Sequence, residues 1–188
     1  NRTRLDEKKF SEVDLKLPFE KETIDYMSVL FDKNRPVAEL FTSDYRVLTA
    51  AMGSFYGMSE QGLKRHKPTL VKTPGAGGLL HQANFFVAQS DGVDPRPFRR
   101  AKWILANVFG HDLREPPGDI NAELFIANAE TLTFEQRTVA HREHKSCRSC
   151  HEALDPIAFA VNDYDTIGRM TGTASKEAKQ NLTAKLST

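Results

Sequence analysis

The segment HREHKSCRSCHEALDP, residues 141–156, contains both cysteines of the chain and three of its six histidines. Cys147 and Cys150 are three residues apart, and His151 follows directly. Two cysteines are too few for a disulfide framework, so their spacing is more informative than their number. On one helical turn the three side chains would project from neighbouring positions. We therefore expect a short helix that carries the cysteines and ends before Pro156.

The five residues CRSCH fit the pattern C-x-x-C-H, which is typical of covalent haem attachment. Two thiols on one turn can each add to a vinyl group of the haem, and the adjacent imidazole can reach the iron. The predicted roles are thioether anchors for Cys147 and Cys150 and proximal iron ligand for His151. One such motif predicts one covalent haem c.

Two other sites use the same cysteine spacing. A thiol redox site of the thioredoxin type needs a βαβ context, which the sequence does not suggest. A zinc site could recruit Cys147, Cys150, His144 and His151, although a cysteine and the histidine next to it are awkward ligands for one tetrahedral ion. Both alternatives stay open on spacing alone.

The residues downstream of the motif add a family resemblance. The run CRSCHEALDPIAFAVNDYDTIGR, residues 147–169, resembles the planctomycete-type cytochrome c proteins, exported bacterial proteins of largely unknown function. Their pattern is C-x-x-C-H followed by D-P-[LI]-[GA]-F-A-L-E-N-[FY]-D-x-[IV]-G-R. The resemblance extends over roughly residues 38–170, through GGLLHQANFF and RRAKWILANVFG. The matching residues after the haem motif are Asp155, Pro156, Phe159, Ala160, Tyr164, Asp165, Ile167, Gly168 and Arg169.

The chain departs from the family pattern at two places. Met170 stands where relatives usually have Trp, and the polar tail lacks the segment that normally continues their C-terminal half. The chain is therefore expected to be a module or relative of that family, and whether it is part of a larger polypeptide or assembly is open.

The second axial ligand of the iron has two main candidates, His141 and Met170. An extended link from His141 to Cys147 could reach ~20 Å, whereas a continuous helix would rise only ~9 Å. Met170 follows a turn-rich segment that could fold back over the ring. The remaining alternatives are His144, His81, Met58 or an open site.

Other side chains are expected around the haem. Arg169, which matches the family motif, is the first choice for the anionic propionates, followed by Arg148 and Arg142. Phe159 and Tyr164 are expected to pack on the macrocycle or as ordinary core aromatics. Asp155 is expected to end the helix before the proline, and Asp165 to pair with Arg169 at helical spacing.

Periodicity along the rest of the chain predicts a mostly α fold, a small helical c-type cytochrome domain with a preceding helical region and little or no β. Helices are expected over 22–33, with apolar positions at Ile24, Met27 and Leu30/Phe31, over 42–57, over 79–90 and after Pro97. Thr133 and Gln136 form a capping-box pattern. Trp103 is expected in the core, and Arg99 and Arg100 on the solvent-exposed face of the same helix. The expected organisation is an arm (1–18), a helical region (19–132), a haem module (133–170) and a polar tail (171–188).

Composition limits the function. The 188 residues carry a net charge of +1, with 39% hydrophobic and 27% charged residues, which suits one globular domain. No basic run interleaved with aromatics predicts nucleic-acid binding, and no apolar run approaches the ~20 residues of a membrane span. The predicted function is single-electron transfer to a redox partner or other cytochrome modules, in the periplasm or outside the cell. The alternative is a haem enzyme with an open iron site.

Overall fold

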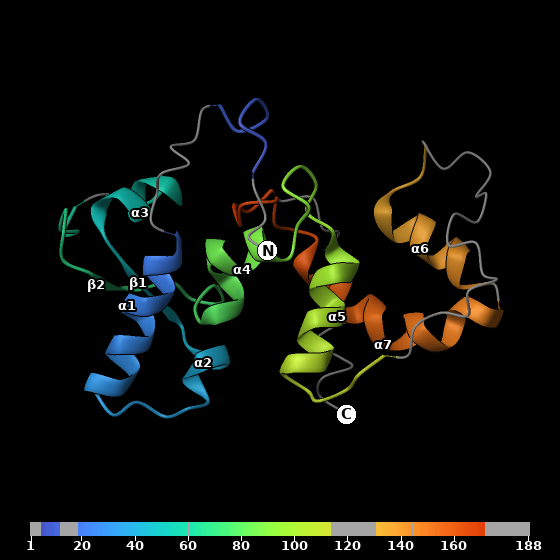
Figure 1. Cartoon of the computed structure of the whole chain (residues 1–188), viewed down its shortest axis with the longest axis horizontal. Coiled ribbons are helices and arrows are strands. Elements are labelled where there is room, and N and C mark those ends of the chain that lie inside the picture. Colours follow the sequence, from blue (N-terminus) through green and yellow to red (C-terminus); the bar gives the residue numbers. More distant parts are fainter. Residues whose placement is uncertain (1–4, 12–18, 60, 114–130, 144, 172–188) are drawn as a thin grey trace. The chain divides into compact units, whose positions relative to one another are not determined.

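The computed structural model describes residues 5–11, 19–59, 61–113, 131–143 and 145–171. These contain seven α-helices, a 3-10 turn and two short strands (Figure 1), which confirms the mostly α prediction. The chain divides into two compact units, residues 1–95 with 164–171 and residues 96–163 with 172–188. Most of the expected arm and nearly all of the expected tail lie outside the described residues, as does His144.

Unit 1 combines short helices with a two-stranded antiparallel sheet, in which Tyr45 pairs with Lys72 and Leu48 with Thr69. The prediction of one helix over 42–57 was wrong, because residues 45–48 form a fully buried strand. Its partner strand lies more than twenty residues later, and a helical period cannot reveal such a pairing. The elements are α1 (Phe19–Asp32), α2 (Glu39–Thr42), β1 (Tyr45–Leu48), α3 (Ala50–Phe55), β2 (Thr69–Lys72), the turn η1 (Leu79–His81) and α4 (Ala83–Ala88).

Helix α1 buries only part of the predicted apolar stripe, since Leu30 is buried and Met27 half-buried. Ile24 is 62% exposed and Phe31 76% exposed. The buried side chains are those of Phe19, Glu22, Tyr26 and Leu30, which also recur at helical spacing. The polar side chains of Glu22 and Tyr26 are accommodated on this face because they are hydrogen-bonded; the Tyr26 hydroxyl, for example, donates to the Glu39 carbonyl at 2.6 Å.

A buried polar cluster joins α1, β1 and α3 in unit 1. The Glu22 carboxylate accepts a hydrogen bond from the Tyr56 hydroxyl at 2.8 Å and lies 3.4 Å from the Arg46 guanidinium, which stacks over the Tyr56 ring. Tyr56 Oη also accepts from the Ala83 backbone N–H. Burial raises the pKa of Glu22 from 4.5 to about 7, although Arg46 and Tyr56 act in the opposite direction. The sequence gives no sign of this cluster.

Glu22 should make the stability of unit 1 depend on pH. Its folded pKa lies above the unfolded one, so the folded state binds the proton more tightly. The resulting stabilisation is complete below about pH 4.5 and is lost as the pH rises through about 7, by about 3 kcal/mol. Chemical denaturation across this range should show the loss for the native chain and for Glu20→Gln, an exposed position of the same helix. An equal loss in Glu22→Gln would contradict the assignment.

The glycine-rich segment TPGAGG, residues 73–78, is packed against the start of β1. A Cβ on Gly77 would lie 2.4 Å from the Ser43 carbonyl oxygen and 2.6 Å from that of Tyr45. Gly78 has a positive φ of 73°, which favours glycine. The Ala76 carbonyl accepts a hydrogen bond from Arg46 Nε at 2.8 Å. These contacts fix the loop that leads into η1 and α4.

Unit 2 contains α5 (Pro97–Asn107), α6 (Phe134–Arg142) and α7 (Lys145–Val161), with α7 packed mainly on α5 and also on α6 (Figure 1). The predicted capping box is confirmed, since the Thr133 side chain accepts from Gln136 N and Gln136 accepts from Thr133 N. Arg99 is exposed as predicted, but Arg100 is fully buried, with its guanidinium donating to the Val161 carbonyl at 3.1 Å. A cation suits this position because the end of a helix carries unpaired carbonyls.

Helix α7 continues through Pro156 to Val161, so the predicted end before the proline was wrong. Proline removes one backbone donor from the helix. Packing of α7 against α5 offsets this cost, and Ala158 of α7 and Ala101 of α5 are both completely buried. As a consequence Asp155 lies inside the helix, where its side chain points to the same face as His151.

Candidate functional site

The first two turns of α7 carry the three residues of the predicted haem motif, Cys147, Cys150 and His151. Cys147 is 6% exposed, Cys150 is half-buried, and no disulfide joins them. Cys147 and His151 are four residues apart and so share a face, whereas Cys150 lies to one side of Cys147. Both thiols and the imidazole therefore project from one short stretch of helix.

The His151 ring is held by a carboxylate one turn further along. His151 Nδ1 lies 2.7 Å from Asp155 Oδ1, and the other oxygen of Asp155 accepts from Arg142 at 3.2 Å. Asp155 is 2% exposed. A carboxylate can only accept, so the ring donates from Nδ1. This bond leaves Nε2 as the nitrogen available to a metal.

Two rings, from α5 and α6, also contact the His151 ring. Its ring centroid lies 5.0 Å from that of Phe98 and 4.9 Å from that of His141. Phe134 contacts Phe98 at 5.3 Å and Phe159 at 5.9 Å. Phe159, predicted to pack on a macrocycle, thus belongs to the aromatic cluster next to the haem motif.

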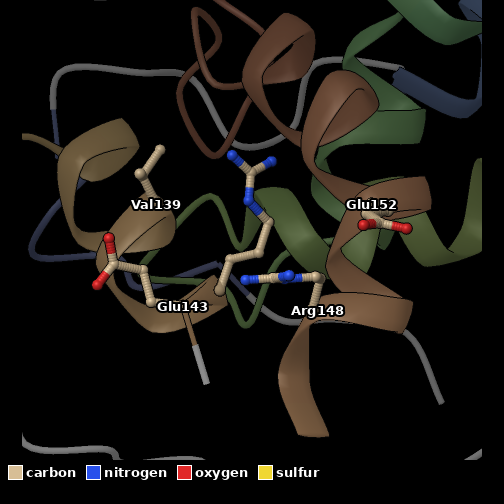
Figure 2. A pocket seen from close by; sticks show the side chains of 5 residues that line it. Val139, Glu143, Arg148 and Glu152 are labelled. Carbon is tan, nitrogen blue, oxygen red and sulfur yellow. The ribbon is translucent and has the colours of Figure 1, made fainter. Parts of the chain in front are cut away.

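A surface hollow of about 560 Å³ lies between α6 and α7. Figure 2 shows Val139 and Glu143 on one side of it and Arg148 and Glu152 on the other. Arg142 also lines the hollow. Arg142 and Arg148 were both considered for the propionates; in the structure Arg142 bonds Asp155, and Arg148 follows Cys147 directly at the edge of the hollow.

Three predicted site residues belong to unit 1. Tyr164 is buried and stacks on Phe86, with ring centroids 4.7 Å apart. Arg169 Nε pairs with Asp165 Oδ2 at 2.9 Å, which confirms the expected pair, although it lies in a turn and not in a helix. Met170 is 64% exposed. Their predicted roles towards a haem stay predictions.

The minor candidates for the second ligand are found in different settings. His81 is half-buried in unit 1, its partial burial lowers the pKa of its imidazole, and its Nδ1 lies 2.7 Å from the Gly77 carbonyl. Met58 packs on the core of unit 1. His144 lies outside the described residues.

The residues of α7 fit a covalent haem. They offer two unpaired thiols three residues apart and a neighbouring imidazole whose Nδ1 is already bonded, and aromatic rings lie next to that imidazole. Among the described residues no group of three or more His, Cys, Asp or Glu side chains gathers as a metal site, and the zinc alternative also needs His144.

Comparison with known proteins identifies the family. Residues 76–174, just over half of the chain, match the family model PSCyt3, described as a protein of unknown function (DUF1588). The chain belongs to the PSCyt3 family. This match confirms the suspected resemblance to planctomycete cytochrome-type proteins over that segment, and a PSCyt3 protein is a cytochrome-like module. No curated protein and no solved structure matches the chain. No helix in the described part of this PSCyt3 chain is long and apolar enough to cross a membrane.

Sequence reasoning missed the direct partners of His151 in this PSCyt3 member. Asp155 was expected to end the helix and bond locally, and instead it bonds the imidazole. The i, i+4 spacing of His151 and Asp155 was visible, but ending the helix at Pro156 concealed it. The contacts of Phe98 and Phe134 are tertiary and have no local signal.

Proposed function

We propose that this chain is a monohaem c-type cytochrome module that transfers single electrons between redox partners. The observation that carries the proposal is the turn of α7 on which two unpaired thiols accompany an imidazole with only Nε2 available. The cytochrome-type family supports the same conclusion. When bound, the haem supplies an iron that alternates between the ferrous and ferric states.

The residues of the chain hold and surround that group. Cys147 and Cys150 form the two thioethers, and His151 Nε2 is the proximal ligand. Phe98 packs directly against the His151 ring, and Phe159 is joined to it through Phe134 in the same aromatic cluster. Tyr164 and Arg169 are proposed for macrocycle packing and propionate binding.

His141 is the better supported second ligand. It lies near the end of α6, and α7 begins at Lys145, so His141 and Cys147 are on separate helices. The short helical rise that argued against His141 therefore does not apply.

Replacing the second ligand should open the iron. We expect His141→Ala to convert a low-spin spectrum into a high-spin one and to allow carbon monoxide to bind the ferrous protein. Met170→Ala, the matched rival, should leave the spectrum unchanged. The reverse pattern would assign the ligand to Met170, and two unchanged spectra would reject both residues.

The spectrum of the native protein distinguishes an electron carrier from a haem enzyme. A six-coordinate carrier should show sharp α and β bands when reduced, should bind neither carbon monoxide nor cyanide readily, and should titrate with one electron against mediators. A high-spin ferric spectrum with ready ligand binding would favour the haem enzyme instead.

Covalent attachment also bears on location and partners. The cytochrome-type family suggests an exported protein, and c-type haems are attached on the outer side of the bacterial inner membrane. We therefore propose a periplasmic or extracellular location, with another redox protein or cytochrome module as the partner.

A further inference from the structure

Asp155 is the buried charged group in direct contact with His151. Its carboxylate is 2% exposed, lies in the middle of α7 and directly precedes Pro156. Aspartate is a poor residue for a helix interior, and a buried carboxylate is costly unless it is paired. Both of its oxygens are paired, one with His151 Nδ1 and one with Arg142.

This arrangement differs from a simple hydrogen bond to a backbone carbonyl. A carboxylate partner on the outer nitrogen fixes the ring orientation and makes the inner nitrogen a stronger donor. Arg142, whose side chain is 34% exposed, withdraws charge from the same carboxylate through its other oxygen. The two residues therefore act on His151 in opposite directions.

We propose that Asp155 and Arg142 are positioning residues that set the reduction potential of the haem iron through His151. This rests on the proposed function. A stronger imidazole donor stabilises the ferric state, so Asp155 lowers the potential. Arg142 moderates that effect by sharing the charge of Asp155.

Asp155→Asn keeps the size and an accepting oxygen but removes the charge. We expect the equilibrium constant for reduction to rise at least about tenfold, a shift of ~59 mV for one electron. Glu152→Gln is the control, since this exposed carboxylate next to His151 has the same charge and lies on the same helix (Figure 2). An equal shift of the potential in the control would mean that only the loss of one negative charge matters, and would overturn the proposal.

Arg142→Gln tests the same pair, with a predicted shift of the potential in the opposite direction. It should lower the potential by a smaller amount, because Asp155 then concentrates its charge on His151. Arg137→Gln, an exposed arginine of α6, should change the potential much less. A purely structural pair predicts shifts of one sign for Asp155→Asn and Arg142→Gln, and that result would refute the proposal.

The mass of each denatured variant separates the two levels of the proposal. Haem-bearing variants with unchanged potentials would overturn the role of Asp155 and leave the cytochrome module intact. A native chain without haem would overturn both. If Asp155→Asn does not accumulate, the comparison of Arg142→Gln with Arg137→Gln decides alone.

Discussion

Replacing Cys147 and Cys150 together with alanine is expected to remove all haem that stays with the polypeptide after denaturation. Each thiol is unpaired in the structure and so available for one thioether bond. Without either sulfur, His151 alone holds a haem only by coordination, which denaturation breaks. Haem-dependent colour in the denatured chain on a gel should therefore fall to background.

The single variants and a neighbour complete this experiment. Cys147→Ala and Cys150→Ala should each keep one thioether, and the remaining vinyl group should move the α band of the pyridine haemochrome to longer wavelength. Ser149→Ala, at an exposed position between the cysteines, should retain full colour. Haem that survives denaturation in the double variant would contradict attachment at this turn.

Gly77→Ala is expected to destabilise unit 1 by about 4 kcal/mol. The new Cβ would approach the carbonyl oxygens of Ser43 and Tyr45 to 2.4 and 2.6 Å. Both are backbone atoms at the entry to β1, so no flexible side chain can move aside. The shift would also disturb the hydrogen bond from Arg46 to Ala76 in the same loop.

Gly75→Ala, two residues earlier, is the matched control for this clash. Gly75 has a positive φ of 70°, and a Cβ there would meet nothing within 4 Å. It should cost only the ~1–2 kcal/mol of a left-handed alanine. Urea denaturation of both variants measures the difference, and equal costs would show that the packing of Gly77 is not as the structure describes.

Short-range sequence patterns were enough to predict the haem motif and those helices whose start or end is marked within a few residues. The capping box of Thr133 and Gln136, the proline at the start of α5 and the cysteine spacing are all of this kind. A half-buried strand alternates apolar and polar residues, but β1 shows no such alternation because its side chains are buried on both faces. The apolar residues of 42–57 were therefore misread as the stripe of a helix. The strand character of β1 depends on pairing with β2.

Burial of polar and charged side chains was the other feature that the sequence did not predict. Arg100 was expected on a solvent-exposed face and Glu22 was not singled out, since burial of a charge depends on partners that only the folded chain provides. Asp155 was misplaced because proline is usually a helix boundary. In each case tertiary contacts overrode a sound local rule.

The most direct test of the account is the intact mass of the native chain, produced in a host that attaches haem to another c-type cytochrome and then denatured in acid. We predict the mass of the 21.1 kDa polypeptide plus one haem, with no thiol left for an alkylating agent. A bare polypeptide mass with two alkylated cysteines would contradict the cytochrome assignment.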